Sequence, residues 1–123
     1  RLQGTIVVLP GVDDRQLAGL YADAAFCLYP SAYEGYGLPV IEAFFHGKAV
    51  LASTGGAIPE VVGEFSPCLD PRDTDLWYST LKRWIVDPNA RAPYEDAIRR
   101  RFRHPTWDEA AARFFREIET ARR

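Results

Sequence analysis

The sequence of 123 residues contains no methionine, only two cysteines and only two histidines. So few sulfur and imidazole groups, in no spacing typical of metal ligands, exclude a structural zinc site, and we predict that the protein binds no metal. Cys27 and Cys68 lie in apolar surroundings, which predicts buried free thiols in a reducing compartment; a disulfide between them is the open alternative. The absence of methionine and the abrupt entry into an apolar run at Thr5 predict a fragment of a longer protein.

Long apolar runs, secretory leaders and internal repeats are also absent. No run approaches the roughly 20 residues of a membrane span, and residues 1–5 do not resemble a secretory signal. The composition, 47% hydrophobic and 26% charged, is typical of a soluble globular protein, and the length fits one domain. We therefore predict a cytoplasmic location.

The net charge of −2 is unevenly distributed. The first 81 residues carry 4 basic and 10 acidic side chains, whereas the remaining 42 carry 11 basic and 7 acidic ones. The densest basic stretch is Arg99–Arg103. A solvated helix face is the favoured interpretation, and peripheral contact with the inner face of a membrane is the alternative. Because no nucleic-acid-binding motif accompanies this stretch, we predict no nucleic-acid partner.

Apolar runs alternate with helical patterns along the first half of the chain. Buried strands are predicted at Thr5–Leu9, Ala24–Tyr29 and Ala49–Ala52, with a short strand near Pro67–Leu69. Helices are predicted from Asp13, where Gln16 completes a capping box, and over residues 38–46 and 59–62. Short loops between these elements indicate βαβ units, so the fold class is α/β with a Rossmann-like parallel sheet and flanking helices.

Residues 74–123 are predicted to be helical throughout. The helices cover about Thr74–Val86 and Asn89–Arg103, and a last helix begins after Pro105 with Thr106 as its cap. Their apolar positions recur at helical spacing, which predicts that these side chains face a core: Leu76, Trp77, Leu81, Trp84, Ile85 and Trp107.

The loop at Ser31–Gly37 follows a predicted strand, at the end of a parallel sheet where ligands bind. Gly35 and Gly37 permit unusual backbone dihedrals and a close approach of a ligand. The helix that begins near Leu38 directs backbone amides into this space, and Pro39 suits its first turn. Such amides and the helix dipole favour an anion, above all a phosphate or diphosphate.

Two carboxylates flank the predicted anion site. Glu34 lies in the loop, and Glu42 lies about one turn inside the helix. Because carboxylates repel a phosphate, they should accept hydrogen bonds from hydroxyl groups. A central diphosphate with hydroxyl-rich groups on both sides describes a nucleotide sugar, which is the predicted partner.

The two glutamates are separated by seven residues that include Gly35-Tyr36-Gly37-Leu38-Pro39. This pattern resembles the signature of the retaining group 1 glycosyltransferases with the GT-B fold. Further matching segments extend the resemblance over essentially the whole chain: Gly11-Val12, Leu20–Ala24, Pro30-Ser31, Gly47–Val50, Gly55–Val62 and Trp107. The resemblance implies that residues 1–123 form part of the C-terminal, nucleotide-sugar-binding half of that fold. It also implies a hexosyltransferase that retains configuration in polysaccharide biosynthesis.

The resemblance implies a role for each residue of the loop. Glu34 would contact the donor-sugar hydroxyls as the catalytic-site residue, and Glu42 would bind the ribose hydroxyls. Amides around Gly35, Tyr36, Gly37, Leu38 and Pro39 would hold the sugar and diphosphate. Gly11 and Val12 would line the nucleobase pocket. No cofactor is expected beyond the nucleotide-sugar substrate.

The family's basic pair that neutralises the diphosphate, and its N-terminal acceptor-binding domain, have no counterpart in this sequence. We therefore expect the fragment alone to be inactive, and a glycan or lipid acceptor to bind through the missing domain. The last helix, without its usual partner, would pack elsewhere or pair with another copy. Two alternatives are a non-catalytic nucleotide-sugar-binding module and a nucleotide-sugar epimerase of the same architecture.

Overall fold

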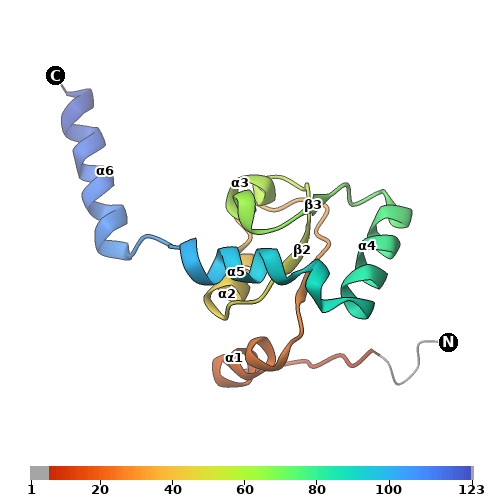
Figure 1. Cartoon of the computed structure of the whole chain (residues 1–123). Helices are drawn as coiled ribbons and strands as arrows, with labels where there is room; N and C mark the ends of the chain where they lie inside the picture. The colour runs from red at the N-terminus through yellow and green to blue at the C-terminus, as the bar shows by residue number, and fades with distance from the viewer. Residues whose placement is uncertain (1–5, 123) are drawn as a thin grey trace.

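A computed structural model of the chain describes residues 6–122 (Figure 1). Helices alternate with short strands in the first half, and helices occupy the second half. In chain order the elements are α1 (Asp14–Asp23), β1 (Cys27–Tyr29), α2 (Leu38–Phe45), β2 (Val50–Ser53), α3 (Ile58–Val62), the 3-10 turn η1 (Gly63–Phe65), β3 (Cys68–Leu69), α4 (Thr74–Val86), the 3-10 turn η2 (Pro88–Ala90), α5 (Ala92–Arg101) and α6 (Trp107–Ala121).

The described strands form one parallel sheet in the order β1-β2-β3. Leu28 pairs with Leu51 between the first two strands, and Ser53 pairs with Leu69 between the last two. Helices α2 and α3 make the crossovers that parallel strands require. The predicted α/β fold with a Rossmann-like parallel sheet is confirmed. Strand β1 is three residues shorter than predicted and β3 is one residue shorter, whereas β2 has the predicted length and begins one residue later.

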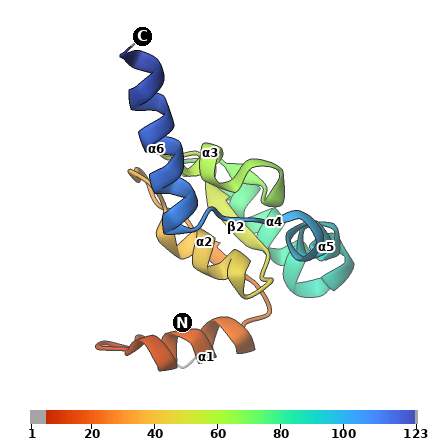
Figure 2. The same ribbon diagram turned by 90° about the vertical axis from the view of Figure 1, so that its left-hand side faces the viewer.

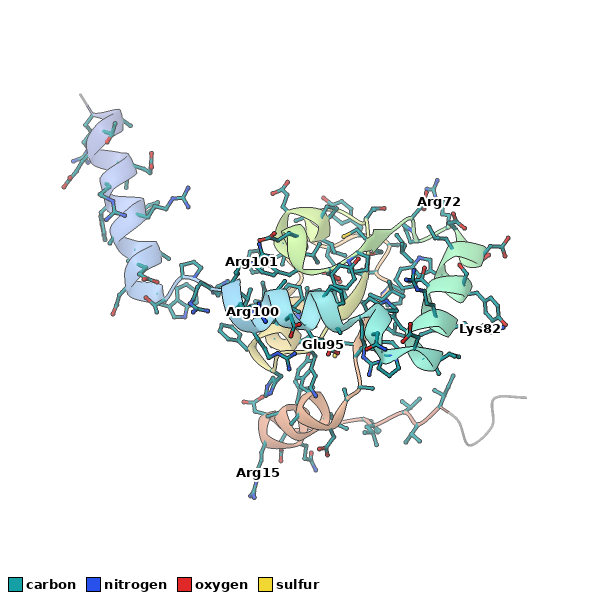
Figure 3. The ribbon with its side chains drawn as sticks, viewed as in Figure 1. Arg15, Arg72, Lys82, Glu95, Arg100 and Arg101 are labelled. Carbon is teal, nitrogen blue, oxygen red and sulfur yellow. The ribbon has the colours of Figure 1, made fainter. Side chains whose placement is uncertain are left out.

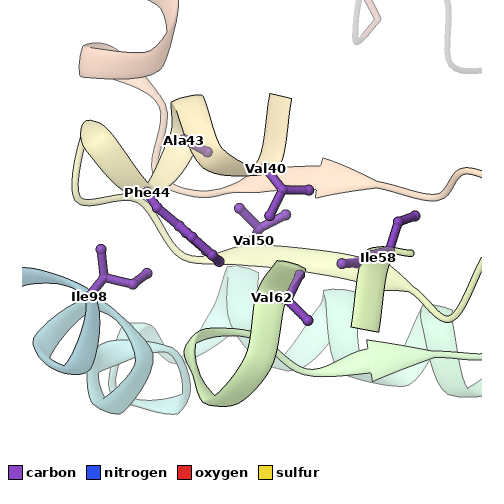
Figure 4. Packing of buried hydrophobic residues seen from close by; sticks show 8 residues of the cluster. Val40, Ala43, Phe44, Val50, Ile58, Val62 and Ile98 are labelled. Atoms are coloured by element: carbon purple, nitrogen blue, oxygen red, sulfur yellow. The ribbon is translucent and has the colours of Figure 1, made fainter. Parts of the chain in front are cut away.

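The central strand β2 is buried along its whole length, and its alternating side chains enter two cores. Val50 and Ala52 face a cluster formed with α2, α3 and α5, which Figure 4 shows around Phe44, Ile58 and Val62. The Phe44 ring meets the rings of Phe65 and Phe102 edge-on, with centroids 5.9 and 5.2 Å apart.

The opposite face of β2 carries the second core. Leu51 packs there with Ala49, Leu69 and Trp84, which α4 contributes. The Trp84 ring packs edge-on against Phe26 with centroids 5.3 Å apart. The central strand is therefore covered on both faces, as expected for a parallel sheet.

The predicted helix caps are confirmed. Asp13 and Gln16 form both hydrogen bonds of a capping box at the start of α1, at 2.8 and 3.0 Å. Thr106 and Glu109 do the same at the start of α6. These reciprocal bonds satisfy amides that the first turn leaves unpaired, which explains why local sequence alone locates these helix starts.

Two helices lie at the periphery. Helix α1 lies at the bottom of both views, below α2 (Figures 1 and 2). Helix α6 projects away from the rest of the molecule, as Figure 1 shows. Neither helix contains a fully buried residue. Trp107 is 92% exposed, so the prediction that it lies in the core is wrong. Helical spacing shows which side chains share a face, but not whether another element covers it.

Further predictions of burial and pairing are corrected in the same way. Ile6–Leu9 are exposed and form no strand, because no described strand offers them backbone hydrogen-bond partners; Thr5 lies outside the described residues. Leu76 and Ile85 of α4 are exposed rather than inward. In β1, Leu28 is exposed, so this strand is not covered on both faces.

The region predicted as one helix over residues 89–103 is divided into η2 and α5. Its basic residues lie outside: Arg99 pairs with Asp96 at 2.6 Å, and Arg101 pairs with Glu64 at 2.8 Å. Arg100 and Arg101, labelled beside α5 in Figure 3, are both exposed. Exposed pairs of this kind contribute little stability, and they favour the solvated-face interpretation.

The two cysteines are free thiols on the outer strands of the sheet, and both are half-buried. Burial raises the pKa of both thiols. Among the described helices, none is long and apolar enough to cross a membrane.

Candidate functional site

The candidate site lies where β1 and β2 end on the same edge of the sheet. The loop after β1 (residues 30–37) meets the turn after β2 (residues 54–57). The Ser53 hydroxyl, on a fully buried residue, donates to the Ser31 carbonyl. The Ala57 amide donates to the Glu34 carbonyl at 3.0 Å. The two segments therefore form one braced unit at the end of the sheet, where parallel α/β folds bind ligands.

Glycines allow this close approach. A Cβ atom on Gly55 would lie 2.6 Å from the Ala32 carbonyl oxygen. A Cβ atom on Gly56 would lie 2.9 Å from the Glu34 amide nitrogen, and nearer still to the Glu34 carbonyl oxygen. Gly56 also has a φ of +62°, which other residues rarely adopt. Both glycines are therefore required by the packing of the loop that carries Glu34.

The amides of Gly35, Tyr36, Gly37 and Leu38, which lead into the helix start, have no hydrogen-bond acceptor among residues 6–122, and neither do those of residues 32–34 earlier in the loop. Gly37, with a φ of +91°, turns the chain into α2. The next two residues add no free donor, because Pro39 has no amide hydrogen and the Val40 amide donates to the Gly37 carbonyl at 3.0 Å. Free amides before and at a helix N-terminus form a binding site for an anion.

Glu34 is half-buried beside these amides. Its carboxylate accepts a hydrogen bond from the Ser31 hydroxyl at 3.1 Å. Burial and, next, the neighbouring Glu34 carboxylate raise the pKa of the Tyr29 phenol. The carboxylate is therefore oriented by groups at the end of β1, as a residue that binds a specific hydroxyl would need to be.

Glu42 lies one turn inside α2 and is also half-buried. The Tyr21 hydroxyl of α1 donates to its Oε2 atom at 3.0 Å. The side chain lines a groove of about 230 Å³ between α1 and α2 and a larger one of about 670 Å³ between α2 and the start of α6. Glu42 is thus open to a ligand while one of its oxygens is already bound.

The larger groove is mostly apolar. Exposed side chains of α2 and the start of α6 line it, including Leu38, Phe45 and Trp107. The Tyr36 hydroxyl and His104 Nε2 are 2.8 Å apart, which links the loop to the segment before α6. His104 Nδ1 lies 3.0 Å from the Pro105 carbonyl.

Gly11 and Val12 do not belong to this cluster. Gly11 turns the chain with a φ of +68° before α1. Val12 lines a separate open groove of about 430 Å³, together with Leu9, Gln16 and Leu20. The structure therefore brings together Glu34, Gly35–Pro39 and Glu42, and places Gly11 and Val12 on a different surface. In the described part of the chain, no three His, Cys, Asp or Glu side chains are grouped to hold a metal ion.

Sequence reasoning missed the residues that hold the site. It included Tyr21 only within the matching segment Leu20–Ala24, and it did not connect Ser53 or the glycine turn with Glu34. The Tyr-to-Glu contact spans 21 positions and the serine contact spans 22, so no local pattern could have revealed them. The adjacent glycines Gly55-Gly56 were the available signal for a close backbone approach.

Comparisons with known proteins show the family to which the chain belongs. The profile of the family described as glycosyl transferases group 1 matches residues 1–87. The chain is 36% identical over 115 residues, 90% of its length, to MMP alpha-(1->4)-mannosyltransferase of Mycolicibacterium hassiacum, of which it covers 28%. It is 45% identical over 89 residues, 72% of its length, to O-antigen chain mannosyltransferase B of Escherichia coli, of which it covers 23%.

A third relative, D-inositol 3-phosphate glycosyltransferase of Xylanimonas cellulosilytica, is 33% identical over 109 residues, 87% of this chain and 26% of the relative. The chain therefore spans about a quarter of the length of these relatives.

Proposed function

This chain belongs to the group 1 glycosyltransferase family, and we propose that it forms the donor-binding part of an enzyme that transfers a hexose from a nucleoside diphosphate sugar to an acceptor. The four free amides of Gly35, Tyr36, Gly37 and Leu38 are the observation that carries this proposal. They supply fixed donors for a diphosphate without any charged side chain. Hydrogen bonds to a charged group contribute about 1.5–3 kcal/mol each, whereas the helix dipole contributes only about 0.3–1 kcal/mol.

In the proposed complex, the two carboxylates bind the neutral ends of the donor. Glu34 accepts hydrogen bonds from sugar hydroxyls, and Glu42 accepts them from the ribose. Both residues are half-buried, and each carboxylate accepts a hydrogen bond from a side-chain hydroxyl that orients it. Because a carboxylate has two acceptor oxygens, each can still accept a hydrogen bond from a ligand hydroxyl. Repulsion by these carboxylates would also keep the diphosphate over the amides rather than beside Glu34 or Glu42.

The proposed reaction retains configuration at the anomeric carbon. The bond between that carbon and the diphosphate oxygen breaks, and the acceptor oxygen forms the new bond on the same face of the sugar. The acceptor proton passes to the departing diphosphate. The loop amides stabilise the charge that develops on this leaving group, and Glu34 orients the sugar rather than forming a covalent intermediate. No resident metal ion is needed in this scheme.

Mannose is the first sugar to test, because two of the similar proteins are named as mannosyltransferases. The names of the relatives mention different molecules, MMP, O-antigen chain and D-inositol 3-phosphate, which favours an acceptor, a glycan or a lipid, that is selected outside this chain.

Nucleotide release from UDP-, GDP- and ADP-sugars, mannosyl donors included, tests the proposal in the intact protein that carries this sequence. We expect release from one donor, unchanged by a chelator, and a fall in kcat/KM of about 10- to 100-fold in Glu42→Ala. Glu95→Ala is the matched control, because Glu95 is also a half-buried helical glutamate with a side-chain partner, Arg91 at 3.1 Å. Equal activity of the two variants would contradict the assignment of Glu42.

A further inference from the structure

Tyr21 contacts one face of α2 along almost its whole length. Its hydroxyl donates to Glu42 Oε2 at 3.0 Å and lies 3.3 Å from the Pro39 carbonyl oxygen. Its ring stacks on the His46 imidazole, with centroids 5.3 Å apart and an interplanar angle of 15°. Residues 39, 42 and 46 lie on one stripe of a helix, so a single tyrosine from α1 spans this stripe from the first turn to the C-cap.

The tyrosine is held firmly enough to orient its partner. Its ring is half-buried and packs against the core cluster around Phe44. A phenol has one hydrogen to donate, and the shorter contact with a charged acceptor directs it to Glu42. Burial, and then the hydrogen bond and charge of Glu42, raise the pKa of Tyr21. The hydroxyl therefore remains a donor throughout the physiological pH range.

One consequence concerns the two oxygens of Glu42. Tyr21 occupies Oε2, whereas Oε1 has no hydrogen-bond partner among the described residues. A carboxylate free to rotate would present either oxygen and would lose this freedom on binding a ligand. With Oε2 fixed, the same oxygen always faces outward.

We infer that Tyr21 is a positioning residue, which holds Glu42 so that its free oxygen accepts hydrogen bonds from the ribose hydroxyls of the donor nucleotide. The inference deepens the proposed function and rests on it. Tyr21 itself need not touch the ligand, because it acts through the carboxylate. A purely structural tether between α1 and α2 is the competing explanation, since α1 buries no residue completely.

A nucleotide that lacks ribose hydroxyls separates these explanations. Calorimetry on the intact protein would compare the nucleoside diphosphate of its donor with the 2′,3′-dideoxy analogue. In Tyr21→Phe, which keeps the ring and its stacking on His46, we expect the Kd of the ribonucleotide to rise about 3- to 10-fold. The Kd of the dideoxy analogue should change less than about twofold, because its binding does not use the oriented oxygen. Tyr78→Phe, at an exposed position of α4, is the control.

Glu42→Ala distinguishes the failure of this inference from the failure of the proposed ribose site. If Glu42→Ala weakens the ribonucleotide selectively but Tyr21→Phe weakens both ligands equally, or neither, Tyr21 is not a positioning residue. If Glu42→Ala also fails to discriminate, the ribose site itself is misplaced. Should Tyr21→Phe not fold, His46→Ala removes only the stacking partner, and the same selective but smaller loss is expected; no selectivity would overturn the inference.

Discussion

The glycine turn after β2 offers a sharp test of how the site is built, through the substitution Gly56→Ala. The added Cβ atom would lie 2.9 Å from the Glu34 amide nitrogen and closer to the Glu34 carbonyl oxygen, whereas ordinary contacts begin at 3.4 Å. The Glu34 backbone must therefore move by more than about half an ångström. Both atoms are backbone, so no side-chain rotation can relieve the overlap.

Two costs add at this position, and Gly63→Ala separates them. Both glycines have positive φ, +62° and +49°, but a Cβ atom on Gly63 would meet nothing within 4 Å. Each alanine costs about 1–3 kcal/mol for a backbone conformation with positive φ, and Gly56→Ala costs about 1–3 kcal/mol more through overpacking. Urea unfolding of the two variants measures the difference between their free energies of unfolding.

Donor turnover is the second measurement that compares Gly56→Ala with Gly63→Ala. A displacement of about 1 Å at a binding site can lower the rate about 100-fold, so we expect donor turnover to fall about 10- to 100-fold in Gly56→Ala. Gly63→Ala, outside the site, should stay within about twofold of the unsubstituted protein. If both variants have the same stability and the same turnover, the turn does not position Glu34.

Three further predictions concern stability. Phe44→Ala removes a ring that is 2% exposed and should lower the free energy of unfolding by about 3–5 kcal/mol in urea, whereas Asp13→Ala, which breaks the capping box of α1, should cost only about 1 kcal/mol. A comparable loss in the two variants would contradict the assigned core. The raised pKa of Tyr21 makes the folded state hold its proton after the unfolded state releases it at about pH 10. The stability that Tyr21 contributes should therefore be constant below about pH 10 and decline above it. In Tyr21→Phe, the free energy of unfolding should decline less steeply above about pH 10 than in the unsubstituted protein. The same pH profile in both proteins would refute this contribution of Tyr21.

Much of the architecture follows from local sequence. The capping pair at Asp13 and Gln16 locates the start of α1, and the bounds Thr74–Val86 of α4 are those predicted. The alternation of short apolar runs with helices predicts the parallel sheet. In these segments, chemistry within three or four residues determines the structure.

Burial and long-range contacts could not be predicted from local sequence. The pattern around Leu76 and Trp107 correctly indicates helices, but both side chains are exposed, because an apolar stripe does not specify what covers it. Ile6–Leu9 have strand-like composition and lack a hydrogen-bonding neighbour in the described chain. The braces at the site, such as Ser53 to Ser31, join positions brought together only by the finished sheet.

The exposed position of α6 has a consequence for how the chain responds to unfolding. A helix of 15 residues is marginal in water without tertiary support, so α6 should open and close without waiting for the sheet to unfold. Its amide hydrogens should exchange with solvent much faster than those of the buried strand β2, and at a rate insensitive to core substitutions such as Phe44→Ala. Hydrogen exchange would then resolve two cooperative units within one short chain, and slower exchange in α6 alone would report directly on any surface that comes to cover it.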